Sequence, residues 1–157
     1  MTISTIKFSL LLYGMRQALR FTAWWHPVFA LRLAEKNFTA QIATFDGSVG
    51  RYFTINGGKI LSGNGLHPAP DIRISVASAE LGARLFVPWV SQLERIEAMK
   101  NFDFKADGPD DLVVWFTQTL LMMQSVGWEY GTPMADGSRR YVTNTNGGPL
   151  FVTVKDG

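Results

Sequence analysis

The chain has 157 residues, of which 46% are hydrophobic and 18% charged, with a net charge of +2 and a sequence pI near 9.0. This composition excludes a disordered chain and suits one domain with a substantial core. The basic residues are scattered without a run, which argues against a nucleic-acid-binding protein, and the lack of Cys fits a reducing compartment such as the cytoplasm.

The first predicted element is an amphipathic helix over residues 5–19. The apolar run after Lys7 is too short for a membrane span, and no signal-peptide cleavage site follows it. A helix with this pattern lies on an anionic bilayer or packs its apolar side on the domain, and the second arrangement is favoured. The apolar side consists of Phe8, Leu11, Leu12 and Met15, with Lys7, Arg16 and Arg20 as its basic companions. Pro27 divides the helical stretch near His26, because a proline disfavours a helical conformation in the residue before it. A second helix therefore follows and runs to about Lys36.

From residue 38 the hydrophobic period changes to two residues, which is typical of strands. Four strands are predicted, over residues 38–45, 50–57, 59–65 and 71–78. Asp46-Gly47 and Asn56-Gly57-Gly58 supply the dipeptides expected in tight turns. The four strands are therefore predicted to form an antiparallel meander.

The remaining chain returns to a helical pattern. Ser78 is the predicted N-cap of a helical stretch that Pro88 divides, and a last strand covers residues 102–106. A long helix over residues 110–124, apolar on nearly every side, follows the capping residue Asp107. These elements place a domain at residues 1–127 and an extended arm, ending in a strand, at residues 128–157.

No catalytic or metal-binding pattern is found in the sequence. His26 and His67 have no partner at metal-ligand spacing, and the acidic residues at 107–111 are explained by the positive end of the long helix. We therefore predict a protein that is not an enzyme and that uses no metal and no cofactor.

Three stretches between residues 38 and 123 resemble the sterol-carrier-protein family in their order and spacing. They read YFTINGGKI, APDIRISVASAEL and IEAMKNFDFKADGPDDLVVWF. The resemblance implies an α/β fold of the α+β type. In this fold a mainly antiparallel five-stranded sheet carries helices on one face and encloses an apolar tunnel for fatty-acyl or sterol-like ligands. The sequence differs from the family at Asp107-Gly108, where the family has Gly-Asp, and in the bulk of Trp115 and Phe116.

The expected ligand-binding site combines the apolar faces of the later helices with the last strand. Its residues are Leu85, Phe86, Trp89, Met99, Phe102, Phe104, Leu112, Phe116, Leu120 and Met123. Adjacent helical positions lie ~100° apart, so Trp115 and Phe116 are predicted to face different surroundings. Phe116 is expected to face the sheet and tunnel. Trp115 is expected near the rim or the N-terminal helices, where its indole N–H finds an acceptor.

The tail, YVTNTNGGPLFVTVKDG, resembles the opening strand of molybdopterin oxidoreductase large subunits, without their cysteines. A generic β-strand is the alternative interpretation.

The leading functional hypothesis is binding or carriage of an apolar small molecule, with peripheral membrane contact as an additional role. A second hypothesis is an accessory domain with a filled core, covered by a partner protein or a second copy. A third is a small lipid-acting hydrolase or isomerase, which needs polar groups converging in the cavity.

Overall fold

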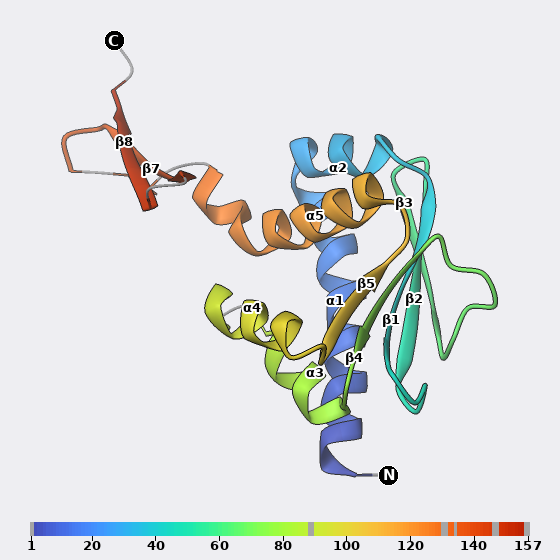
Figure 1. Ribbon diagram of the computed structural model, residues 1–157. Helices are drawn as coiled ribbons and strands as arrows, with labels where there is room; N and C mark the ends of the chain where they lie inside the picture. The colour runs from blue at the N-terminus through green and yellow to red at the C-terminus, as the bar shows by residue number, and fades with distance from the viewer. Residues whose placement is uncertain (1, 88–89, 130–131, 134, 146–147, 156–157) are drawn as a thin grey trace.

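The computed structural model describes residues 2–87, 90–129, 132–133, 135–145 and 148–155. Five strands form one sheet, and helices pack on one face of it, which confirms the predicted α+β fold class (Figure 1). The helices are α1 (Ile3–Trp25), α2 (Pro27–Ala34), α3 (Ala79–Leu85), α4 (Gln92–Lys100) and α5 (Asp110–Glu129). The strands of the sheet are β1 (Phe38–Thr44), β2 (Gly50–Asn56), β3 (Lys59–Asn64), β4 (Ile72–Val76) and β5 (Phe104–Asp107).

The helix boundaries follow from short polar residues at their ends. Thr2 caps α1, and its hydroxyl accepts a hydrogen bond from the backbone N–H of Thr5. His26 ends α1 and caps α2, because its Nδ1 accepts from the backbone N–H of Phe29 while Pro27 occupies the first turn. Ser78 caps α3 as predicted.

The strand order of the sheet is β3-β2-β1-β4-β5. The pairs β1–β2, β2–β3 and β4–β5 are antiparallel, but β4 pairs parallel with β1, for instance at Ile42 and Ile74. The predicted meander is therefore correct for three strands and wrong for the fourth. The chain crosses from β3 to the free side of β1, so β1 lies at the centre of the sheet and all seven of its residues are buried.

The core lies between α1, α5 and the sheet. Phe8, Leu12 and Leu19 of α1 are fully buried, as are Phe53 of β2 and Phe116 of α5. Phe8, Leu12 and Met15, which belong to the apolar side predicted from sequence, pack on the domain. This excludes a bilayer as the contact surface of that side.

The C-terminal region forms a second small sheet of β6 (Thr132–Pro133), β7 (Arg139–Thr145) and β8 (Gly148–Val154). It lies at the far end of α5 from the five-stranded sheet (Figure 1). β7 and β8 pair antiparallel, for instance at Tyr141 and Val152. The sequence predicted only a loop or extended arm with one final strand here, so β6 and β7 were missed.

Candidate ligand-binding site

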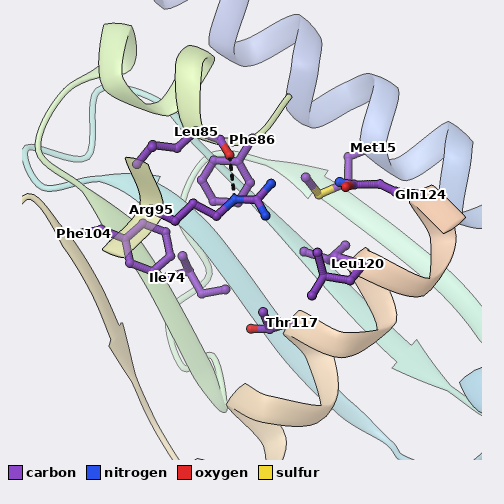
Figure 2. Close-up of a pocket in the computed structure, with 10 residues that line it drawn as sticks. Met15, Ile74, Leu85, Phe86, Arg95, Phe104, Thr117, Leu120 and Gln124 are labelled. Carbon is purple, nitrogen blue, oxygen red and sulfur yellow. Dashed lines mark hydrogen bonds between the residues drawn. The ribbon is translucent and has the colours of Figure 1, made fainter. Parts of the chain in front are cut away.

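A cavity of about 80 Å³ lies between the helices and the face of the sheet that they cover (Figure 2). Six secondary-structure elements and the residue that follows α3 contribute to its wall, which is mainly apolar. The lining residues are Met15, Ile74, Leu85, Phe86, Arg95, Phe104, Thr117, Leu120, Leu121 and Gln124.

The sheet side of the cavity is set by the alternation of strand side chains. Ile72, Ile74 and Val76 of β4 are buried, so they point to the same face of the sheet. Phe104 of β5 is paired with Val76 in the register of the two strands and therefore shares that face. The cavity floor thus consists of Ile74 with Phe104 beside it.

The position of Phe86 depends on a close approach between α3 and α1. A Cβ atom at Gly82 would lie only 2.5 Å from the ring of Phe8, so only glycine permits this separation. The rings of Phe8 and Phe86 lie 5.9 Å apart, and those of Phe86 and Phe104 lie 6.3 Å apart. Phe86 and Phe104 thus form an aromatic wall along one side of the cavity, and Phe8 packs behind Phe86.

Among the described lining residues, the one charged side chain is that of Arg95 on α4. Its Nε donates a hydrogen bond of 3.3 Å to the backbone oxygen of Leu85, the last residue of α3. Burial lowers the pKa of the Arg95 guanidinium, although an arginine stays protonated in proteins. Figure 2 shows the guanidinium directed into the cavity.

The structure brings together four of the residues that the sequence assigned to the ligand site: Leu85, Phe86, Phe104 and Leu120. Phe116, Leu112 and Met123 belong to the core or pack against it and do not line the cavity. Met99 and Phe102 are 53% and 74% exposed and also lie outside the lining. Trp89 lies outside the described residues.

The sequence did not single out Met15, Ile74, Arg95, Thr117, Leu121 and Gln124 as site residues, although they line the cavity. Three of them lie on α5, the helix of Leu120, and the other three come from α1, β4 and α4, which only the packing of the fold brings together. The signal available for Arg95 was a cation on a helix with apolar neighbours, which is common on ordinary surface helices.

Trp115 and Phe116 of α5 face different surroundings, as the sequence predicted: Phe116 faces the sheet and Trp115 faces an N-terminal helix. Phe116 faces the sheet, with its ring 5.9 Å from that of Phe38 and 6.3 Å from that of Phe53. Trp115 lies against α2, and its indole N–H donates to Glu35. Phe116 is fully buried and does not line the cavity.

The cavity is therefore small for a carrier. Pockets that enclose a drug-sized ligand have volumes of roughly 300–1,000 Å³. A cavity of about 80 Å³ has room for a small part of a lipid. A larger guest requires the cover to move, and α4 is the most weakly anchored part of that cover, because Ala98 is its one buried residue among the side chains described.

A second surface with unusual chemistry runs along α1 and α2, opposite the side of α1 that packs on the sheet. The exposed apolar residues of α1 recur at steps of three and four, so they share one side of the helix. This side lies about half a turn from the side that carries the buried residues. Its large exposed side chains are Ile3, Ile6, Leu10, Tyr13, Phe21, Trp24, Trp25, Val28 and Leu31. Residues 3–34 contain Lys7, Arg16, Arg20 and Arg32 but no acidic residue. We call this the α1–α2 apolar face.

Other chemical features are sparse in the described part of the chain. No group of three His, Asp or Glu side chains there is placed to hold a metal ion. Within the same residues, no helix has both the length and the apolar character needed to cross a membrane.

No family model and no curated protein matches the sequence. Among solved structures, the UbiJ-SCP2 ubiquinone synthesis protein has a similar fold, with a TM-score of 0.50 and 11% identity over 73% of this chain and 92% of that chain. The sec-alkylsulfatase Pisa1 from Pseudomonas sp. shares 14% identity with a TM-score of 0.42, over 58% of this chain and only 13% of the enzyme. The fold is thus like that of a protein of the SCP2 class, in line with the sequence resemblance. Nothing in the comparisons supports the resemblance of the tail to molybdopterin enzymes.

Proposed function

We propose that this protein binds an apolar small molecule, without catalysis, in the cavity between α1, α4, α5 and the sheet. The observation that carries the proposal is the apolar wall of that cavity, to which six elements contribute in a fold like that of an SCP2 protein. The described lining contains no carboxylate and no His, so it offers no general base for a hydrolase or isomerase.

The guest enters by displacing α4. Burying one methylene group contributes ~0.8 kcal/mol, so a chain of about ten methylenes supplies up to ~8 kcal/mol towards opening the cover and ordering the ligand. This hypothesis also explains why α4 has exposed apolar side chains. Leu93, Ile96, Met99 and Phe102 at its surface and C-terminal end provide apolar area for an expanded cavity.

Titration with a fluorescent fatty acid, a fluorescent sterol and a ubiquinone analogue tests the proposal. We expect at least one of them to bind with a Kd below roughly 10 μM. A Leu120→Phe variant places extra bulk in the cavity wall and should weaken binding. Val114→Phe adds the same ring to an exposed position of the same helix and serves as the matched control, with unchanged binding.

Native mass spectrometry of freshly purified protein is an independent measurement, because a bound lipid adds a defined mass. Absence of binding by all three probes, together with a lipid-free mass, would exclude carriage and favour an accessory domain with a filled core. Equal effects of Leu120→Phe and Val114→Phe would place the binding site elsewhere.

The α1–α2 apolar face favours a second function, contact with an anionic membrane surface from which a ligand is taken up. Trp24 is 80% exposed, and Phe21 and Leu31 are also exposed. Lys7 and Arg20 of α1 complement a surface of anionic lipids, whereas a second copy of α1 would bring like charges together. Arg32 is instead paired with Glu35. The charge pattern therefore favours an anionic bilayer as the surface that covers the α1–α2 apolar face.

Co-sedimentation with vesicles measures this contact. We expect binding to phosphatidylcholine vesicles that contain phosphatidylglycerol, weaker binding at high salt, and little binding to phosphatidylcholine alone. Replacing Phe21 and Trp24 by Ser should reduce binding at least tenfold, whereas Leu61→Ser, at an exposed apolar position of β3, should leave it unchanged. Lack of vesicle binding combined with a dimer in solution would assign the face to a second copy.

A further inference from the structure

The guanidinium of Arg95 is a cation placed in an apolar cavity without a matching anion. Within the described part of the chain, no carboxylate forms an ion pair with Arg95. Its neighbour in sequence, Glu94, lies 3.9 Å from Arg84 instead. Arg95 shares the cavity wall with apolar residues such as Met15, Ile74 and Leu120. A cation in such surroundings loses part of its hydration, and this free-energy cost is offset only when an anion lies beside it.

The hydrogen bond to the end of α3 uses only part of the hydrogen-bonding capacity of the Arg95 side chain. A guanidinium has five N–H donors, and the hydrogen bond to the backbone oxygen of Leu85 uses the one on Nε. That carbonyl lies at the C-terminal end of a helix, where acceptors are unsatisfied and a positive charge is favoured. The bond therefore orients the side chain, while the two terminal nitrogens remain available on the cavity side (Figure 2).

We propose that Arg95 binds the negatively charged head group of the ligand, so that the cavity selects an amphiphile with one apolar chain and an anionic end. This inference rests on the proposed function, since it names the class of ligand for the same cavity. The planar guanidinium binds carboxylate, phosphate and sulfate groups through paired hydrogen bonds. The chain of the amphiphile then extends towards Ile74, Phe86 and Leu120, and the head stays near α4.

The polar side chains of the cavity wall fit the same arrangement. Thr117 and Gln124 on α5 are the other polar residues of the wall, and both carry groups that donate hydrogen bonds. Neither adds a negative charge, so the lining as a whole is positively charged. A neutral sterol would leave the guanidinium unpaired, and a cationic amphiphile would be repelled.

The test compares three ligands with the same sixteen-carbon chain: palmitate, hexadecanol and hexadecyltrimethylammonium. Displacement of a fluorescent probe from the full-length protein, below the micelle concentration of each ligand, gives three dissociation constants. We expect palmitate to bind at least about tenfold more tightly than hexadecanol, and the ammonium compound to bind most weakly. This series needs no variant and therefore tests the inference even where a substitution impairs folding.

Variants then assign the preference to Arg95. Arg95→Met and Arg95→Gln remove the charge, so the affinity ratio of palmitate to hexadecanol should fall to about one while hexadecanol binding is kept. Arg84→Met is the matched control, because Arg84 is exposed on the neighbouring helix and does not line the cavity. Circular dichroism melting confirms that each variant is folded.

The outcomes separate this inference from the proposed function. If wild type binds none of the three ligands, the proposed function fails and the inference falls with it. If wild type binds palmitate and hexadecanol equally, or if both Arg95 variants keep the preference for palmitate, the cavity binds lipids but Arg95 does not select their head group.

Discussion

The indole N–H of Trp115 donates a hydrogen bond of 2.9 Å to Oε2 of Glu35, and this bond joins α5 to the end of α2. Arg32 completes the contact, with its guanidinium carbon 4.7 Å from the centre of the Trp115 ring and its Nη1 3.2 Å from the same carboxylate oxygen. Trp115 is buried, whereas about half of the Glu35 side chain is exposed. The three residues hold α2 against the helix that forms one wall of the cavity.

A double-mutant cycle on this pair should show coupling. Trp115→Phe keeps an aromatic ring but removes the donor, and Glu35→Ala removes the acceptor. We expect a coupling free energy of about 0.5–1.5 kcal/mol from urea unfolding of the two single variants and the double variant. Additive single effects would show that the bond contributes nothing to stability.

Phe116 is predicted to be a stabilising core residue, because its side chain is fully buried and contacts the rings of Phe38 and Phe53. Phe116→Ala should lower the free energy of unfolding by about 3–5 kcal/mol. Val114→Ala, at an exposed position two residues earlier in α5, should change it by less than about 0.5 kcal/mol. A loss below about 1 kcal/mol for Phe116→Ala would mean that the interior around this ring is open and adaptable.

The pH dependence of stability has a contribution from Asp111. Its Oδ2 lies 2.8 Å from Nζ of Lys36, and this hydrogen bond is the main cause that lowers the pKa of Asp111 below its ordinary value. A carboxyl group whose pKa is lower in the folded state stabilises the fold above its unfolded pKa of about 3.9, and the contribution disappears as the pH falls through the folded pKa. Asp111→Asn should therefore be less stable than wild type near pH 7.

The difference between Asp111→Asn and wild type should shrink as the pH falls below about 4, because the carboxyl group of the unfolded chain takes up a proton first, and it should disappear once the folded carboxylate is protonated as well. It should be small throughout and smaller in 1 M salt, because both charged groups are partly or largely exposed. Thermal unfolding from about pH 3 to 7 measures it. In a Lys36→Met background the effect of Asp111→Asn should decrease, and an unchanged effect would assign it to the helix dipole instead.

Local sequence signals were sufficient for most of the fold. The period of two residues located the strands of the large sheet, the Asn56-Gly57-Gly58 turn separated β2 from β3, and Ser78 marked the start of α3. These features depend on neighbouring residues alone, so a single sequence contains them. The parallel pairing of β4 with β1 was missed because partner choice depends on the route of the chain between strands, for which residues 65–71 hold no local signal.

The candidate site was only partly accessible to the same reasoning. Leu85, Phe86, Phe104 and Leu120 were expected because they belong to apolar faces of predicted elements. Met99 and Phe102 are equally apolar but lie at the surface, and Phe102 has a positive φ of 61° at the end of α4. Hydrophobicity therefore identified candidates for burial without saying which of them share a cavity. The second apolar face of α1 was missed because a single apolar side is enough to explain an amphipathic helix that packs on a domain.

The two helical glycines Gly82 and Gly14 should respond in opposite ways to replacement by Ala. A Cβ at Gly82 would meet the Phe8 ring at 2.5 Å, and Phe8 is fully buried against Phe86, so α3 or the ring must shift. We expect Gly82→Ala to destabilise the protein by about 1–3 kcal/mol. A Cβ at Gly14 would meet nothing within 4 Å beyond its own helix, so Gly14→Ala should stabilise the protein by about 0.5–1 kcal/mol through helix propensity alone.

Urea unfolding of both glycine variants measures the pair, and ligand titration adds a second readout. Because the Phe8 ring that the new Cβ would push packs against Phe86 of the cavity wall, the ligand affinity of Gly82→Ala should fall while that of Gly14→Ala stays the same. A stabilising Gly82→Ala would show that α3 does not pack closely on α1, and the aromatic wall of the cavity would then lack its physical basis.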